Sequence, residues 1–208
     1  MSNYVSATLI TMQLSERAKE LIPKARIVSF ATWKNLYSDE VIAIFQQADN
    51  RSEYLTDEDL ESIQNLVPDT SLMLAQVRLL REQAPNLVAN ARAKVLTEFP
   101  NIAEPGNDLY PPARAEACWR DFWHFLRSVT YGIAGNNPEF LSQEGLKNME
   151  LLYQELGVPV PAMLCGLEQL KTVSLQQFSS EEQDLLSLNF DHLISALKQF
   201  ISFPAASE

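Results

Sequence analysis

The chain has 208 residues, of which 46% are apolar and 21% charged, a composition typical of one globular domain with room for an appendage. Its 27 acidic and 16 basic residues give a formal net charge of -11, which argues against nucleic acid and other polyanions as partners. No apolar run approaches the roughly 20 residues that span a bilayer, and the N-terminus lacks the pattern of a signal peptide. We therefore expect a protein that is neither exported nor integral to a membrane.

The composition predicts helices rather than strands, because Leu, Ala, Glu and Gln fill the intervals between eleven prolines and six glycines. The expected helices, in chain order, lie within residues 14–37 around Pro23 and at residues 38–49, 57–67, 70–99, 113–133, 142–156, 161–175 and 180–200. Ser15, Thr56 and Ser179 are the predicted N-caps of three of them. The fold class is therefore expected to be all-α.

Several breaks interrupt this helical pattern. Residues 27–30 are rich in β-prone side chains. Pro85 is expected to divide the helix at residues 70–99 into two, or to kink it. Residues 100–112 form the longest predicted loop, and residues 203–208 are expected to be a frayed tail.

The segment Ala117-Cys118-Trp119-Arg120-Asp121 places a thiol, a guanidinium and a carboxylate within one helical turn. A helix rises about 1.5 Å and turns about 100° per residue, so Cys118 and Asp121 lie on adjoining faces about 4.5 Å apart along the axis. One conjugated, acid-bearing ligand could contact both, while Arg120 reaches a carboxylate at its rim. On the other interpretation, Cys118 is a surface cysteine that acts as an inert packing residue, and the two charges are solvated.

Other site chemistry has little support in the sequence. His124 and His192 are the only histidines, and neither belongs to a metal-binding motif. Cys118 and His124 are six residues apart, too far round one helix for a thiolate–imidazole pair. Cys165 lies among leucines and is expected to be a buried packing thiol, and both cysteines are expected to be reduced. We therefore expect neither an enzyme nor a metal site.

A series of short motifs follows one order along residues 38–200. The motifs are Tyr54-Leu55, Pro105-Gly106-Asn107, the string C-x-R-D-x-x-x-x-L-R-x-V-T-Y-G from Cys118 to Gly132, Tyr153-x-x-Leu156-Gly157-Val158-Pro159, Gly166-Leu167-x-x-Leu170-Lys171 and Phe190-Asp191-x-Leu193-Ile194. In this order and spacing the chain resembles the phycobiliproteins, the bilin-carrying relatives of the globins, and the allophycocyanin subunits most of all. The resemblance implies an all-α, globin-like phycobiliprotein fold with extra N-terminal helices. Its expected divisions are an N-terminal helical extension at residues 1–37, the globin-like domain at residues 38–203 and a tail at residues 204–208.

The resemblance also implies a covalently bound cofactor, a linear tetrapyrrole (bilin), with phycocyanobilin as the expected one. Cys118 would form a thioether with its ring-A side chain. Asp121 would accept hydrogen bonds from the pyrrole N–H groups and favour the protonated pigment. Arg120 would pair with one propionate and Arg114, one turn before the cysteine, with the other.

Two further residues match positions in the family pattern. Asn107 corresponds to a residue that many members methylate, although its distance from the cysteine differs by one residue. Tyr153 would close the pigment pocket, or would be an ordinary core aromatic. Trp119 and His124 depart from the usual residues and would change the pocket wall, and residues 1–37 have no counterpart in ordinary antenna subunits.

The leading hypothesis is a bilin-binding subunit for light harvesting and energy transfer in a phycobilisome or related complex, located in the cytoplasm or peripheral to the thylakoid membrane. Its expected partners are another phycobiliprotein-like subunit, in a hetero- or homodimer, and antenna or photosystem assembly proteins. One alternative is a chromophore-free or transiently loaded paralogue that assists bilin biosynthesis, phycobilisome assembly or photosystem assembly. A third hypothesis is a globin-like regulatory module that binds a small molecule without a covalent bond.

Overall fold

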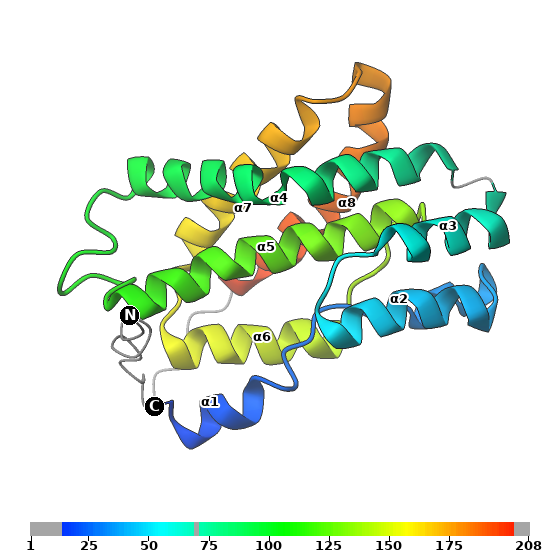
Figure 1. Cartoon of the computed structure of the whole chain (residues 1–208). Coiled ribbons are helices and arrows are strands. Elements are labelled where there is room, and N and C mark those ends of the chain that lie inside the picture. Colours follow the sequence, from blue (N-terminus) through cyan, green and yellow to red (C-terminus); the bar gives the residue numbers. More distant parts are fainter. Residues whose placement is uncertain (1–13, 69–70, 202–208) are drawn as a thin grey trace, which may run out of the picture.

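The structure is a computed structural model that describes residues 14–68 and 71–201, and within these ranges the fold is all-α (Figure 1). The helices are α1 (Glu16–Leu21), η1 (Ala31–Asn35), α2 (Asp39–Arg51), α3 (Asp57–Leu66), α4 (Ser71–Glu98), α5 (Pro112–Ala134), α6 (Gln143–Leu156), α7 (Val160–Leu175), α8 (Ser180–Lys198) and η3 (Gln199–Ile201). None of the helices in the described ranges is both long and apolar enough to cross a bilayer.

The predicted N-caps are confirmed. The Ser15 side chain accepts a hydrogen bond from a backbone N–H in the first turn of α1. Thr56 with Asp59, and Ser179 with Glu182, form complete capping boxes at the starts of α3 and α8. These local bonds satisfy backbone donors that a helix start leaves unpaired, which is why short-range sequence signals locate these helix starts.

Pro85 does not divide its helix, so the prediction of two helices at residues 70–99 is wrong. α4 continues through Pro85 from Ser71 to Glu98. Pro85 itself is exposed, while one face of α4 is buried on both sides of it; the buried residues are Leu74, Val77, Leu80, Ala84, Leu87, Ala91 and Val95. Tertiary packing of this face offsets the hydrogen bond that proline removes.

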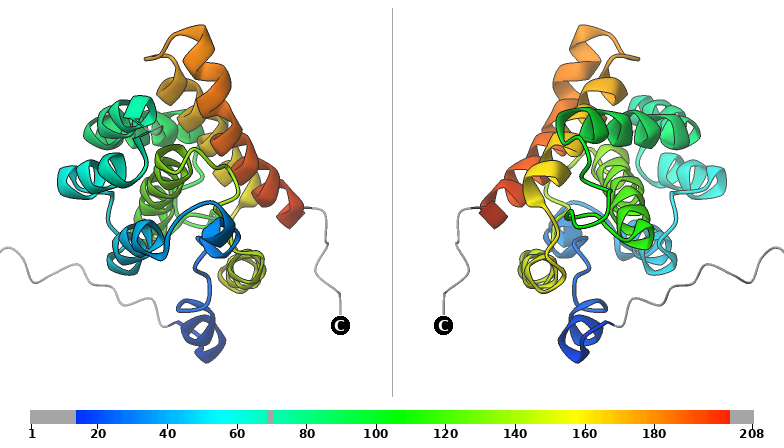
Figure 2. Two further views of the ribbon diagram at one scale, coloured as in Figure 1. Left: turned by 90° about the vertical axis from the view of Figure 1, so that its right-hand side faces the viewer. Right: turned by 90° about the vertical axis from the view of Figure 1, so that its left-hand side faces the viewer.

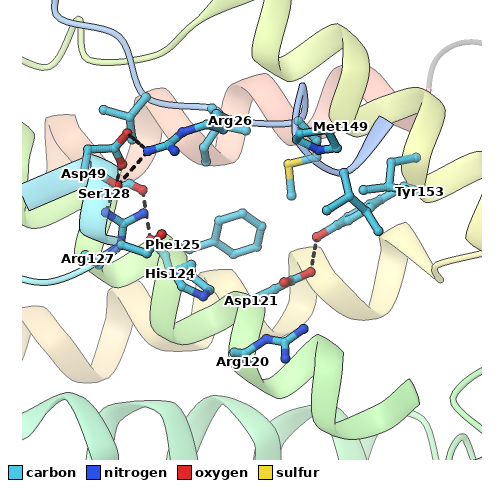
Figure 3. A pocket seen from close by; sticks show the side chains of 17 residues that line it. Arg26, Asp49, Arg120, Asp121, His124, Phe125, Arg127, Ser128, Met149 and Tyr153 are labelled. Carbon is cyan, nitrogen blue, oxygen red and sulfur yellow. Dashed lines mark hydrogen bonds and ion pairs between the residues drawn. The ribbon is translucent and has the colours of Figure 1, made fainter. Parts of the chain in front are cut away.

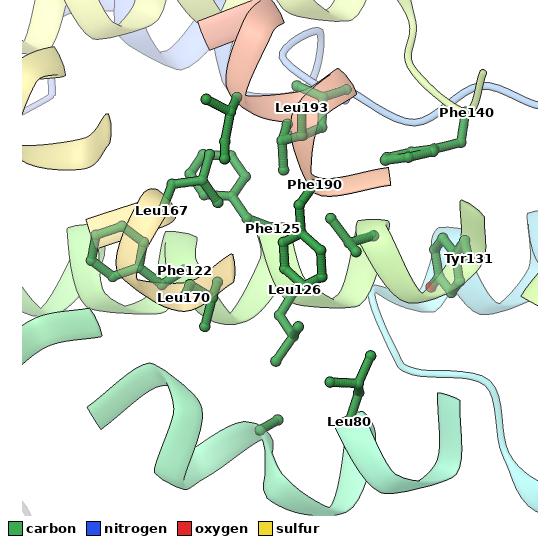
Figure 4. Packing of buried hydrophobic residues seen from close by; sticks show 14 of the residues in the cluster. Leu80, Phe122, Phe125, Leu126, Tyr131, Phe140, Leu167, Leu170, Phe190 and Leu193 are labelled. Atoms are coloured by element: carbon green, nitrogen blue, oxygen red, sulfur yellow. The ribbon is translucent and has the colours of Figure 1, made fainter. Parts of the chain in front are cut away.

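Helix α5 runs through the middle of the bundle, and the other long helices surround it (Figures 1 and 2). It packs against α4, α7 and α8. The buried hydrophobic cluster around α5 includes Phe122, Phe125, Leu126 and Tyr131 of α5 and, from other segments, Leu80, Phe140, Leu167, Leu170, Phe190 and Leu193 (Figure 4). A Cβ at Gly166 would lie 2.1 Å from the Phe122 ring, so this glycine lets α7 approach α5 closely.

The N-terminal segment contributes to the same core. Ile27, Phe30 and Trp33 belong to the main hydrophobic cluster, and Trp33 is fully buried. The Trp33 indole donates a hydrogen bond to the Glu139 carbonyl oxygen at 2.9 Å. The core is therefore continuous across the predicted boundary at residue 37. The predicted tail at residues 203–208 lies outside the described residues.

Candidate functional site

A cavity of about 460 Å³ lies between α5, α6, the C-terminal end of α2 and the N-terminal segment (Figure 3). Its lining residues are Ile22, Pro23, Ala25, Arg26, Ile27 and Val28 from the N-terminal segment, Asp49 and Ser52 at the end of α2, Arg120, Asp121, His124, Phe125, Arg127 and Ser128 from α5, and Met149, Leu152 and Tyr153 from α6. The α5 residues recur at intervals of three and four and so share one face of that helix. The cavity combines apolar walls with charged groups at two opposite ends.

Asp121 and Tyr153 form one end of the cavity. The Tyr153 hydroxyl donates a hydrogen bond to Asp121 Oδ2 at 2.8 Å. Burial raises the pKa of Asp121 to about 6, although the Tyr153 hydrogen bond and the Arg120 charge act in the opposite direction. Burial, and then the charge of Asp121, raise the pKa of Tyr153 well above 10, so its hydroxyl keeps its proton at neutral pH.

Arg120 and Asp121, two of the predicted site residues, both line the cavity. Arg120 is exposed, and within the described residues its guanidinium makes no hydrogen bond or ion pair, although its charge acts on the neighbouring Asp121 carboxylate. Its charge is therefore available to a ligand carboxylate. Tyr153 is both a pocket residue and a core residue, since its side chain is only 4% exposed and it packs against Phe200.

Cys118 is not the surface cysteine that the sequence suggested. It is 3% exposed and does not line the cavity. Burial, and then the nearby charge of Asp121, raise the pKa of its thiol to about 12, although the charge of Arg114 acts in the opposite direction. Cys118 therefore lies close enough to Asp121 to be coupled to it electrostatically, but as a neutral, covered thiol.

Arg114 and Asn107 lie away from the cavity. The Arg114 guanidinium donates hydrogen bonds to the carbonyl oxygens of Leu156 and Gly157, where α6 ends. These carbonyls are acceptors that a helix end leaves unpaired, so Arg114 closes the α6 terminus in this structure. Asn107 is exposed in the loop before α5, where its backbone N–H donates to the Glu104 carbonyl at 3.1 Å.

The opposite end of the cavity is a charged cluster that the sequence analysis missed. Asp49 is 3% exposed, and its Oδ1 accepts a hydrogen bond from the Arg127 guanidinium at 2.9 Å. Arg26 donates to Asp49 Oδ2 at 2.7 Å and to the Asp49 carbonyl oxygen at 2.6 Å. Arg127 also donates to the Tyr131 hydroxyl at 2.6 Å. The signal for Asp49 was its position on the buried face of α2, one residue after Ala48 and four after Phe45.

His124 lies between the two ends of the cavity (Figure 3). Burial, followed by the charges of Arg127 and Arg120, lowers its pKa to about 4, so its imidazole is neutral at pH 7. Trp119, the other unusual residue, is 5% exposed and stacks on Phe122, which makes it a core residue rather than a wall of this cavity.

A second, more open depression of about 540 Å³ lies between α4 and α7, lined by Lys94, Glu98, Phe99, Cys165, Glu168, Gln169 and Thr172. Cys165 was expected to be buried, but it is partly exposed here. Both cysteines are free thiols. Leu164 and Leu167 in the same turn of α7 are buried, whereas Cys165 lies at the edge of this groove, a difference that the spacing of leucines did not reveal.

Comparison with known proteins supports the resemblance seen in the motifs. Residues 43–197 match the family model described as phycobilisome protein. The chain is 30% identical over 154 residues to the allophycocyanin subunit alpha-B of Nostoc sp., an alignment that covers 74% of this chain and 96% of that protein. It is 32% identical over 140 residues to the C-phycocyanin-3 beta subunit of Microchaete diplosiphon, covering 67% and 81% of the two chains.

The allophycocyanin alpha chain of Thermosynechococcus vestitus is 29% identical over 151 residues, covering 73% of this chain and 94% of that one. The matched region contains Asp49, Cys118, Asp121 and Tyr153, whereas Arg26 precedes it. With the motif order, the all-α fold and these matches in agreement, the chain belongs to the phycobilisome protein family.

Proposed function

We propose that this protein is a bilin-binding subunit for light harvesting and energy transfer in a phycobilisome or related complex. The observation that carries the proposal is the placement of Arg120 and Asp121, adjacent on α5, at the wall of the 460 Å³ cavity. The family resemblance assigns these two residues to a bilin propionate and to the pyrrole N–H groups. A cation and a carboxylate side by side at the cavity wall support this proposal.

The charges and walls of the cavity fit a bilin. Asp121 Oδ2 has the Tyr153 hydroxyl as its donor, while Oδ1 has no hydrogen-bond donor within the described residues. A partly buried carboxylate with spare acceptor capacity suits a ligand with N–H groups. Phe125, Met149 and Leu152 supply apolar contact for conjugated rings. Once held, the pigment supplies absorption of visible light, and the protein restricts its motion.

The positions of Cys118 and Arg114 agree less directly with the roles proposed for them in bilin binding. The Cys118 thiol is covered, so attachment requires the surrounding side chains to uncover it. Arg114 would have to leave the carbonyls at the end of α6 before it could reach a propionate. Addition of the thiol to a bilin double bond moves the thiol proton to the pigment, so the mass gained equals one intact bilin.

The test is an intact mass measured under denaturing conditions on the full chain, coexpressed with phycocyanobilin synthesis and phycobiliprotein attachment enzymes. We expect a gain of one bilin mass in the wild type and in Cys165→Ala, and none in Cys118→Ala. Cys165→Ala is the matched control because it removes the other, more exposed free thiol. Pigment retained in Cys118→Ala and lost in Cys165→Ala would move the attachment site to the groove between α4 and α7.

A second candidate function is favoured by the state of Cys118. Its burial and its pKa of about 12 suit a paralogue that is chromophore-free or loaded only transiently, and that assists bilin biosynthesis or the assembly of phycobilisomes or photosystems. In that case the wild type would gain no mass although it folds as a soluble helical protein. Reversible binding of free bilin would then support a transiently loaded carrier.

The proposal extends to partners and location. We infer association with a second phycobiliprotein-like subunit, in the cytoplasm or at the thylakoid surface. A net charge of -11 would give selectivity and an ionic-strength dependence to such assembly. Co-purification with phycobilisomes from a cyanobacterial host tests this, and a chain that remains monomeric and separate from them would contradict it.

A further inference from the structure

We propose that residues 22–28, the N-terminal strap, form the wall that determines access to the pocket, and that Arg26 is the positioning residue that holds this wall. The inference rests on the proposed function, since it concerns the same cavity. Six of the seven strap residues, all except Lys24, line that cavity opposite α5 and α6. Arg26 lies outside the residues that match the family model, which begin at residue 43.

The strap sits tightly against the start of α6. A Cβ built on Gly145 would lie 1.8 Å from the Arg26 carbonyl oxygen, so only glycine permits this approach. The Ser142 N–H donates to the Ile27 carbonyl at 2.8 Å, and the Ser29 N–H donates to the Phe140 carbonyl at 2.9 Å. These contacts join the strap to the segment between α5 and α6 and fix its distance from the cavity.

Both ends of the strap are anchored. On one side, α1 packs against α6 and buries Ala18 and Leu21. On the other side, Phe30 and Trp33 are buried in the main core. Between these anchors Ile22, Pro23 and Lys24 are exposed, and Ile22 and Pro23 also line the cavity, so the strap borders both the cavity and the solvent.

Arg26 joins the middle of the strap to α2 through hydrogen bonds. Its guanidinium bridges the carboxylate and the carbonyl oxygen of Asp49, at 2.7 and 2.6 Å. Asp49 keeps its second partner, Arg127, when Arg26 is removed, because the two guanidinium groups use different carboxylate oxygens. Loss of Arg26 therefore releases the strap without leaving a buried carboxylate unpaired, so the variant is expected to fold.

The experiment compares Arg26→Ala, Arg26→Lys and Gly145→Ala with Arg51→Ala, all in the full chain carrying Cys118→Ala to prevent covalent attachment. Arg51 is the matched control: its side chain is 47% exposed, as is that of Arg26, and it makes a 2.8 Å ion pair, but with Glu53 and not with the strap. Two quantities are measured. One is amide hydrogen exchange at Ser29 and Ser142, and the other is the dissociation rate of two probes, free phycocyanobilin and the anionic dye anilinonaphthalene sulfonate.

We expect Arg26→Ala to increase both the exchange and the probe dissociation rate roughly two- to fivefold, as loss of one half-exposed ion pair allows. Gly145→Ala should increase them more, because a Cβ excludes the seated strap. Arg26→Lys should recover part of the effect, and Arg51→Ala should match the wild type. The unfolding midpoint of Arg26→Ala should stay near that of Arg51→Ala, which separates positioning of the strap from general stability.

Unchanged exchange in Arg26→Ala and Gly145→Ala would overturn the proposal, and so would increased exchange with unchanged dissociation of the probes. If phycocyanobilin fails to bind the Cys118→Ala protein while the dye binds, the bilin assignment fails and the dye alone decides the role of the strap. Protein that binds neither probe would refute a ligand-access role for the strap.

Discussion

Asp49 and Asp121 lie at opposite ends of the same cavity, and the two carboxylates differ in how their charge is compensated (Figure 3). Each oxygen of Asp49 accepts from a guanidinium, Arg26 on one side and Arg127 on the other. Within the described residues, Asp121 accepts from a single neutral donor, the Tyr153 hydroxyl.

The difference distinguishes a structural cluster from the proposed binding site. The Asp49 cluster uses its acceptors within the protein and joins the N-terminal segment, α2 and α5. The Asp121 end keeps spare acceptor capacity and a pKa raised to about 6, so a ligand that donates hydrogen bonds there relieves an unfavourable burial. Four experiments test this contrast.

Asp49→Ala should have the largest effect on stability. It leaves the buried Arg127 guanidinium without its carboxylate, and loss of one partner of a buried ion pair typically costs about 3–5 kcal/mol. Chemical denaturation followed by far-UV circular dichroism measures the cost. Arg51→Ala, which breaks an exposed pair, should unfold at the wild-type midpoint, and equal midpoints for the two variants would contradict the structural role of Asp49.

Asp121→Asn should raise the free energy of unfolding relative to the wild type by an amount that depends on pH. Because the pKa of Asp121 is about 6 in the folded state and about 3.9 in an unfolded chain, the folded state binds its proton more tightly. The wild type therefore loses stability, up to about 3 kcal/mol, as the pH rises from about 4 to about 6. Asparagine does not ionise, so the stability of the variant relative to wild type should rise over this window. A constant difference between the two proteins would show that Asp121 titrates normally.

Tyr153→Phe should cost about 1–3 kcal/mol at neutral pH, because it removes the hydroxyl donor from an ionised, buried carboxylate. The cost should fall below about pH 5, where Asp121 is protonated and the hydrogen bond is no longer charge-assisted. Tyr54→Phe is the matched control, since the Tyr54 hydroxyl donates to the neutral Trp123 carbonyl at 3.2 Å. If both variants show the same pH profile of unfolding free energy, Tyr153 does not stabilise the Asp121 charge.

Cys118→Ala should have the smallest effect on stability, about 1 kcal/mol, since it removes one buried sulfur atom. Before denaturation, a thiol reagent at about pH 8 should label Cys165 and not Cys118, whose pKa is about 12. In the Cys165→Ala variant, the reagent should label Cys118 only after the protein unfolds. Rapid labelling of Cys118 in that folded variant would show that the thiol near Asp121 is already accessible.

Much of the fold could be predicted from short-range patterns. Ser15, Thr56 and Ser179 located helix starts because a cap acts on N–H groups two or three residues away. Division of the helix at Pro85, one of the two predicted alternatives, was wrong because the local penalty of proline is offset by packing of α4 against α5 and α7, which involves residues distant in sequence. Burial of Cys118 was missed for the same reason, since the exposure of a side chain depends on tertiary packing and not on its neighbours in sequence.

The sequence by itself determined that Arg120 and Asp121 lie next to each other on one helix and that their motif belongs to the phycobilisome protein family, because helical periodicity and motif order are properties of a single stretch of chain. Only the tertiary structure decided what faces them across the cavity. Tyr153 reaches Asp121 from α6, and Arg26 reaches Asp49 from the N-terminal strap. Such partners are selected by packing, in which buried apolar faces and close approaches at residues such as Gly145 fix the distance between segments.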